Sequence, residues 1–185
     1  MIGRFTIETM ATRILALSLV ALLAQSSALP ADSQQLDLAT GYNYQSNDQG
    51  EGSRSNLNGW YVSLQYDLSE RISVTAELDS YYGSFQQQSL RQQNYVAGPQ
   101  FTFRSANAKW RPFVFMQAGD QRSSFLNSVT HSFDLQIGGG LETKLSNRVS
   151  LQLTPAEYNL AVQSGTPTHS VSANIGVIWT LWKQN

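Results

Sequence analysis

Side chains alternate between apolar and polar along most of the chain after Ala31, and this period of two recurs in eight segments. None of the eight segments shows the i, i+3, i+4, i+7 spacing of an amphipathic helix. Successive side chains of a β-strand point to opposite faces, so the alternation predicts strands with one apolar and one polar face. The predicted strands cover residues 35–46, 57–69, 71–84, 92–104, 109–119, 131–145, 148–162 and 170–182.

The apolar face of these predicted strands carries no charged residue. In segment 57–69, for example, Trp60, Val62 and Leu64 share one face, whereas Ser63 and Gln65 share the other. A Lys or Arg on a lipid-facing strand surface costs about 2–4 kcal/mol at the bilayer midplane. Charges on the polar face instead fit the hydrogen-bonded interior of a barrel. The predicted polar network of the lumen comprises Glu77, Asp79, Arg104, Arg111, Asp134, Glu142, Lys144 and Glu157.

Alternation alone also fits a soluble, lipocalin-like barrel, whose apolar face points inward around a ligand. The positions of the aromatic residues favour the opposite orientation. When the strands are threaded up and down, Tyr42, Trp60, Tyr82 and Tyr95 fall toward one rim, and Trp110 and Trp179 toward the other. Amphipathic rings favour the headgroup zones of a bilayer. We therefore predict an all-β fold, an eight-stranded antiparallel up-and-down transmembrane β-barrel.

The connections between the predicted strands alternate in length. Connections of roughly 8 to 12 residues, which contain the polar runs 47–54, 85–91 and 120–126, alternate with tight turns at Ser69, at residues 105–108 and at Ser146. Outer-membrane barrels have short periplasmic turns and longer external loops. The long segments are therefore predicted to be exposed loops, available for adhesion or recognition.

Segment 148–162 contains one irregularity. Its apolar residues are odd-numbered at Leu151 and Leu153 but even-numbered at Tyr158 and Leu160. A change of parity near Pro155 predicts a β-bulge, a site at which proline is tolerated.

The first thirty residues form a separate unit. Arg4 and Arg13 precede an apolar run over residues 14–24, and small residues ending in Ala28 follow. This pattern is typical of a secretory signal peptide, and the run falls short of the about 20 apolar residues of a transmembrane helix. We predict a signal peptide over 1–28, with cleavage after Ala28 or Ala31, and a barrel domain over 32–185; Met10 is an alternative start of translation.

The last predicted strand resembles the C-terminal signal that the barrel-assembly machinery recognises in outer-membrane proteins. The residues that match are Asn174, Gly176, Trp179 and Leu181, although the chain continues through residues 182–185. The segments 95–103, 111–114 and 138–141 resemble the family of small OmpA-like outer-membrane β-barrel domain proteins, and the likeness extends from Leu36 to Leu181.

The resemblance implies an eight-stranded barrel in the bacterial outer membrane. It implies as partners the outer-membrane lipid, including lipopolysaccharide, and the barrel-assembly machinery during biogenesis, with a monomer expected. The family has no shared catalytic residues to carry over. The peptidoglycan-binding domain that follows the barrel in full-length OmpA is not expected here, because the chain ends with the barrel.

Composition and the placement of histidines argue against several other functions. A net charge of −1 without a basic stripe gives no case for nucleic acid, and the absence of cysteine excludes thiolate catalysis. His131 and His169 are each followed by a serine, Ser132 and Ser170, but adjacent strand residues point to opposite faces. We predict no enzymatic activity, no metal site and no cofactor.

The predicted interior leaves two readings open, with a lipid A-modifying enzyme as a less favoured third. In the first, the inward acids Glu77, Asp79, Asp134 and Glu157 are protonated or paired, and the side chains plug the lumen. The candidate partners for pairing are the loop arginines Arg54, Arg91 and Arg122. The barrel then has a structural or envelope role, or a role in surface interaction. In the second, the same acids line a narrow, cation-preferring pore.

Overall fold

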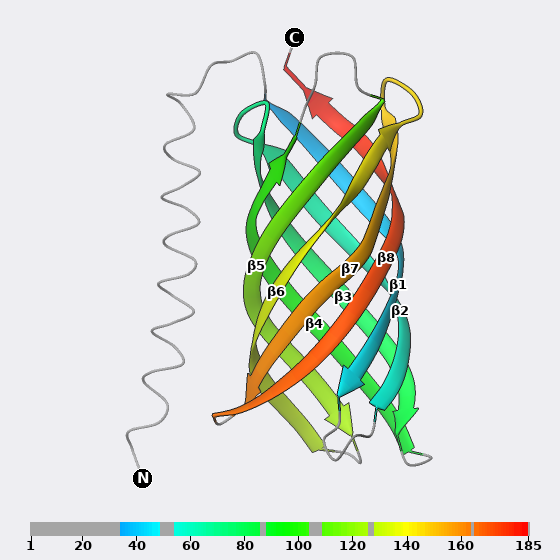
Figure 1. Cartoon of the computed structure of the whole chain (residues 1–185), viewed down its shortest axis with the longest axis vertical. Coiled ribbons are helices and arrows are strands. Elements are labelled where there is room, and N and C mark those ends of the chain that lie inside the picture. Colours follow the sequence, from blue (N-terminus) through cyan, green and yellow to red (C-terminus); the bar gives the residue numbers. More distant parts are fainter. Residues whose placement is uncertain are drawn as a thin grey trace. The chain divides into compact units, whose positions relative to one another are not determined.

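A closed barrel of eight strands accounts for nearly all of the described chain (Figure 1). The computed structural model describes residues 34–48, 54–85, 88–103, 109–125, 128–163 and 165–184. Each strand pairs antiparallel with its neighbours in sequence, and the last pairs with the first. The strands are β1 Gln35–Asp48, β2 Arg54–Asp67, β3 Ile72–Phe85, β4 Gln88–Thr102, β5 Trp110–Phe125, β6 Ser128–Lys144, β7 Val149–Gln163 and β8 Thr166–Lys183.

The predicted antiparallel all-β barrel is thus confirmed. The predicted signal peptide over 1–28 and its cleavage sites lie outside the described residues. Across the part of the chain that the structure describes, no helix is long and apolar enough to cross a membrane.

The two ends of the barrel are distinguished by their connections. We call the end that is joined through residues 49–53, 86–87, 126–127 and 164–165 the loop end, which lies at the bottom of Figure 1. The other end is joined through residues 68–71, 103–109 and 145–148, and we call it the turn end. Two of its turns share one chemistry, because Ser69 and Ser146 each accept a hydrogen bond, from the backbone N–H of Ile72 and Val149 respectively.

The prediction of long loops at 85–91 and 120–126 is wrong. β4 begins at Gln88, β5 runs to Phe125, and the ladders continue to the pairs Phe85↔Gln88 and Phe125↔Ser128. Apolar residues are too sparse in these segments to give the alternation by which a strand is recognised. Pairing still satisfies their backbone N–H and C=O groups, and only a lipid-facing surface requires an apolar face.

The interior of the barrel is polar and its exterior apolar, which excludes the lipocalin-like arrangement. Asn43 and Asp134 are fully buried inside, whereas Trp60 and Ile137 on the outer face are 44% and 47% exposed. Far more of the buried side chains are polar than apolar. An exterior of this kind requires an apolar solvent, as a bilayer provides.

The irregularity predicted in segment 148–162 is confirmed as a register shift between β7 and β8. The shift falls between Thr154 and Glu157, around Pro155. It keeps Thr154 and Glu157 both inside the barrel although their numbers differ in parity, so an acid reaches the lumen at a point where strict alternation would have placed it outside.

Candidate functional site in the barrel interior

The half of the interior nearer the turn end contains a buried carboxylate that is paired with an arginine. Arg111 Nη2 of β5 lies 3.0 Å from Glu142 Oε2 of β6, and the Glu142 side chain is almost fully buried. Gln100 Nε2 of β4 donates to Glu142 Oε1 at 3.3 Å, and Arg111 also donates to Ser150 Oγ of β7 at 3.4 Å. Four neighbouring strands are therefore linked through one ion pair, formed by two residues of the predicted lumen network.

The half nearer the loop end contains acids whose partners are neutral. Asp79 accepts from Asn43 Nδ2 at 2.8 Å, and Asp134 accepts from Gln136 Nε2 at 2.9 Å. Glu157 accepts from the Ser172 hydroxyl at 3.0 Å and from Asn174 Nδ2 at 3.1 Å. Among the described residues none of these three carboxyls forms an ion pair.

Most of the buried side-chain atoms that lack a hydrogen-bond partner in this half are acceptors. Asp79 Oδ2, Asp134 Oδ1 and the side-chain oxygens of Asn43 and Gln136 are buried without a hydrogen-bond partner among the described residues. Asp79 lies close enough to Glu157 and Asp134 to interact with both electrostatically. The loop half of the interior is therefore an acid-lined, acceptor-rich layer.

The predicted pairing of these acids with Arg54, Arg91 and Arg122 is wrong. The three arginines lie on the outward face of their strands: Arg54 donates to Ser46 Oγ at 3.1 Å, and Arg122 donates to Gln93 Oε1 at 3.0 Å. The reason is parity. Because these segments are strands rather than loops, each arginine must alternate with its inward neighbours and cannot fold back into the lumen.

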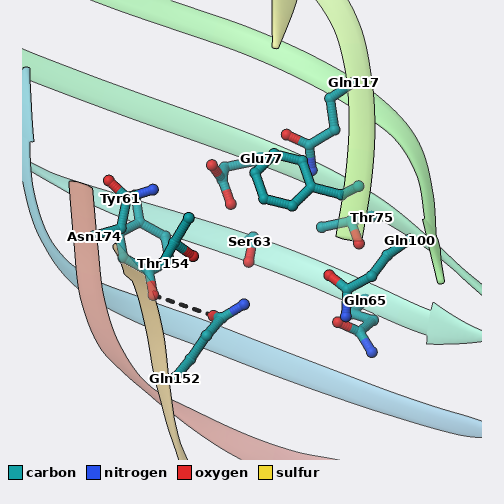
Figure 2. A pocket seen from close by; sticks show the side chains of 11 residues that line it. Tyr61, Ser63, Gln65, Thr75, Glu77, Gln100, Gln117, Gln152, Thr154 and Asn174 are labelled. Atoms are coloured by element: carbon teal, nitrogen blue, oxygen red, sulfur yellow. Dashed lines mark hydrogen bonds between the residues drawn. The ribbon is translucent and has the colours of Figure 1, made fainter. Parts of the chain in front are cut away.

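A small cavity lies between the two halves. Its volume of about 20 Å³ leaves room for one or two waters. Figure 2 shows the Glu77 carboxyl pointing into it, and the Tyr61 hydroxyl donates to Gln152 Oε1 at 3.3 Å on its wall. Glu77, which belongs to the predicted network, is therefore the acid with access to this space.

Aromatic rings fill the interior where facing strands supply glycine. A Cβ at Gly176 would lie 2.2 Å from the Tyr61 hydroxyl, and one at Gly41 would lie 2.7 Å from the Tyr61 ring. A Cβ at Gly140 would likewise meet the Phe113 ring at 2.8 Å. Sequence reasoning missed this packing. The inward-facing glycines in the strands could have indicated this packing, since a glycine in a strand often marks the close approach of another group.

An apolar cluster supplied by β2 to β5 fills part of the lumen near the loop end. Leu57 and Tyr81 are fully buried, Leu90 is nearly so, and Phe125 packs against them. Sequence reasoning missed this cluster as well, because it placed Leu90 and Phe125 in loops. We call these four residues the apolar plug.

The other predicted site residues take the following positions. Lys144 is exposed at the turn end, and Arg104 lies outside the described residues. All six predicted girdle residues are exposed on the outer face: Tyr42, Trp60, Tyr82, Tyr95, Trp110 and Trp179. Of the predicted assembly signal, Asn174 and Gly176 face inward and Trp179 and Leu181 outward. Recognition by the assembly machinery stays a prediction.

Both histidines lie on the outer face and are held by neighbours other than serine. His131 Nδ1 is 2.8 Å from Asp120 Oδ2, and His169 Nδ1 is 2.5 Å from the Tyr158 hydroxyl. Ser132 and Ser170 are buried on the opposite face. Within the described ranges, no three His, Asp or Glu side chains gather in a way that could hold a metal ion.

The fold and the polarity of its two faces define a class, the small outer-membrane-type β-barrel. No protein-family model matches the chain, and no curated protein matches it. Neisserial surface protein A is 14% identical to this chain, with a TM-score of 0.69 over 79% of this chain and 97% of that protein. Ail, the attachment invasion locus protein of Yersinia pestis, is 13% identical, with a TM-score of 0.56 over 80% and 99%.

The N-terminal β-barrel domain of Pseudomonas aeruginosa OprF is a third structure with a similar fold. It is 14% identical, with a TM-score of 0.52 over 80% of this chain and 99% of that domain. Likeness at this level of identity concerns the fold. It confirms the predicted resemblance to small OmpA-like barrels, and together with the apolar exterior it supports the predicted outer-membrane location.

Proposed function

We propose that the protein is an outer-membrane barrel with a closed interior, whose role is in envelope structure or in surface contacts made at its loop end. The observation that carries this proposal is the filled lumen. The apolar plug occupies one end, the Arg111–Glu142 pair spans the other half, and the described cavity between them holds about 20 Å³. A barrel of eight strands has an interior just wide enough for side chains to fill.

The plug is the main obstacle to an ion. Leu57 and Tyr81 show no exposed surface, so an ion passing them would lose its hydration without gaining a polar partner. Polar side chains also lie beside the plug, since Gln45 pairs with Leu57 across β1 and β2, but Gln92 Nε2 donates to Gln45 Oε1 at 3.0 Å, so these groups bond to one another instead of lining an open path. We therefore propose that the polar interior stabilises the barrel rather than conducting.

Planar-bilayer recording on the purified, refolded protein tests the closed lumen. We expect no stable unitary currents from the wild type. The triple variant Leu57→Ala, Tyr81→Ala, Leu90→Ala should show currents, because it removes the plug while leaving the polar layer in place. The matched control is Leu64→Ala with Ile137→Ala, which truncates outward-facing side chains only.

Stable unitary currents from the wild type would contradict the closed lumen and favour the second candidate, a narrow cation-preferring pore. The observation in favour of that candidate is the layer of acids Asp79, Asp134 and Glu157, which has no ion-pair partner among the described residues. In that case the reversal potential in a KCl gradient should report cation selectivity, and Asp79→Asn should reduce it.

The proposal includes contact with outer-membrane lipid, including lipopolysaccharide, and with the barrel-assembly machinery during biogenesis. The support for a surface role is that the ladders at the loop end continue to the pairs Phe85↔Gln88 of β3–β4 and Phe125↔Ser128 of β5–β6. Ail, which shares the fold, has also been crystallised in complex with the heparin analogue sucrose octasulfate. Cell fractionation with heat-modifiability on gels tests the location, and a soluble periplasmic protein would contradict it.

We also propose that the protein has no catalytic role. Neither histidine has a hydrogen bond to a serine among the described residues, and the serines adjacent to them face the lumen. Lipid A incubated with the folded protein should therefore keep its acyl chains and phosphates, as read by mass spectrometry. Release of either group by the wild type would contradict the proposal.

A further inference from the structure

Two arginines lie side by side on the outward face of β4 and β5 near the loop end. The guanidinium carbon of Arg91 lies 5.3 Å from the centre of the Tyr82 ring. Arg122 Nη1 donates to Gln93 Oε1 at 3.0 Å, and Gln93 pairs with Arg122 across the two strands. Arg91 pairs with Ser124, so the two arginines are diagonal neighbours on one face, with about 7–8 Å between their backbones.

The register places these arginines just beyond the aromatic rim of the barrel. The row below them on the same face contains Tyr95, Asp120 and Phe133, which pair with one another across β4, β5 and β6. Tyr95 and Phe133 are 48% and 53% exposed. Aromatic side chains in such positions lie at the headgroup level of a membrane, so Arg91 and Arg122 lie where the lipid phosphates are expected.

No acid among the described residues pairs with either arginine, so both guanidinium groups can bind an anion. Asp120, the acid in the neighbouring row, is engaged by His131 at 2.8 Å. Neither Arg91 nor Arg122 forms an ion pair among the described residues. Each guanidinium has five N–H donors, and Arg122 uses one of them on Gln93. Tyr82 and Gln93 therefore orient the two side chains without neutralising them.

We propose that Arg91 and Arg122 together bind a phosphate group of an outer-leaflet glycolipid, with His131 at the edge of the site. This inference rests on the proposed outer-membrane location. Guanidinium groups form strong, often bidentate hydrogen bonds with phosphate. The register places the two arginines as diagonal neighbours on adjacent strands, so a phosphate group at the barrel wall is within reach of both long side chains. A membrane lipid is favoured over a soluble polyanion because the side chains project sideways from the barrel wall, next to the aromatic rim, and not over the mouth of the lumen.

The test measures binding of bisphosphorylated lipid A to the refolded full chain in detergent micelles by native mass spectrometry. The double variant Arg91→Gln, Arg122→Gln should weaken binding by about tenfold or more, the loss of two charge-assisted contacts. Arg54→Gln is the matched control, because Arg54 lies on the same outward face near the same end but donates to Ser46. It should bind like the wild type.

Two further binding measurements distinguish a lipid phosphate from a soluble polyanion as the ligand. Lipid A without phosphates should bind the wild type as weakly as bisphosphorylated lipid A binds the double variant. Sucrose octasulfate, a soluble polyanion, should not displace the lipid at equal concentration. Equal binding by wild type and double variant, indifference to the phosphates, or displacement by the soluble polyanion would each overturn the inference.

The variants must first show the same heat-modified band as the wild type, which establishes that each barrel has folded. If the double variant does not fold, Arg91→Lys with Arg122→Lys takes its place, since it keeps the charge but removes the planar donors and should bind with intermediate affinity. Failure of the lipid test with folded barrels leaves the proposed function intact. A fractionation result outside the outer membrane would instead remove the proposed function itself.

Discussion

The two halves of the barrel interior provide different partners for their buried carboxyl groups. Near the turn end Glu142 is paired with Arg111 and supported by Gln100. Near the loop end Asp79 and Asp134 accept from the side-chain amides of Asn43 and Gln136. Among the described residues neither acid forms an ion pair, and one oxygen of each has no hydrogen-bond partner. Both halves are polar and buried, yet among the described residues a buried carboxylate paired with an arginine is found only in the first.

This difference shows that a polar barrel interior is not one uniform network. A buried ion pair is expensive to break, because the remaining charge is left without its partner. A buried acid without a counterion already bears a desolvation cost that its neutral neighbours only partly offset. The same substitution, from carboxylate to amide, should therefore have opposite effects in the two halves.

The largest effect is expected from Arg111→Ala, which removes the ion-pair partner that lies 3.0 Å from the buried Glu142 carboxylate. We expect the free energy of unfolding to fall by about 3–5 kcal/mol, the usual cost of breaking a buried pair. Urea titration of the refolded barrel, followed by tryptophan fluorescence and heat-modifiability, measures this loss. Arg71→Ala, an exposed arginine in a turn, is the control. Equal stability of the two variants would show that the pair contributes nothing to the turn half.

A smaller loss is expected at the boundary between the halves, where the Tyr61 ring lies against Gly176. Gly176→Ala should lower the free energy of unfolding by about 1–3 kcal/mol, because the added methyl overlaps the tyrosine hydroxyl. Adding Tyr61→Phe should restore part of the loss. The relief is only partial because the Thr40 carbonyl oxygen lies 2.6 Å from the same Cβ position. A double-mutant cycle in urea measures the coupling, and full additivity would contradict the proposed contact.

The smallest effect, and the one of opposite sign, is expected in the loop half. Asp79→Asn and Asp134→Asn each keep one accepting oxygen and turn the other into a donor, among acceptors such as Gln136 Oε1 that have no partner among the described residues. Each should raise the free energy of unfolding by about 1 kcal/mol. Glu142→Gln, the same change in the turn half, should lower it. If all three variants shift in the same direction in urea titrations, the contrast between the two halves is wrong.

The sequence determined the strand number, their antiparallel order and the identity of the two faces. It did so because lipid imposes a strict rule: every outward residue between the rims must be apolar, and this rule appears in the sequence as a period of two. The same rule revealed the bulge near Pro155, where the parity changes and a register shift is found.

Tertiary structure alone decided where the strands end and which inward groups meet. Beyond the apolar layer of the membrane the rule no longer applies, so residues 88–91 and 120–125 carry no such pattern, although they form part of β4 and β5. Arg91 and Arg122 therefore face outward instead of reaching the acids. Contacts such as Arg111–Glu142 and Tyr61–Gly176 depend on the stagger between strands in the closed barrel. Alternation assigns a residue to a face but does not fix its height in the lumen, because stagger is a property of the closed sheet and not of any single strand.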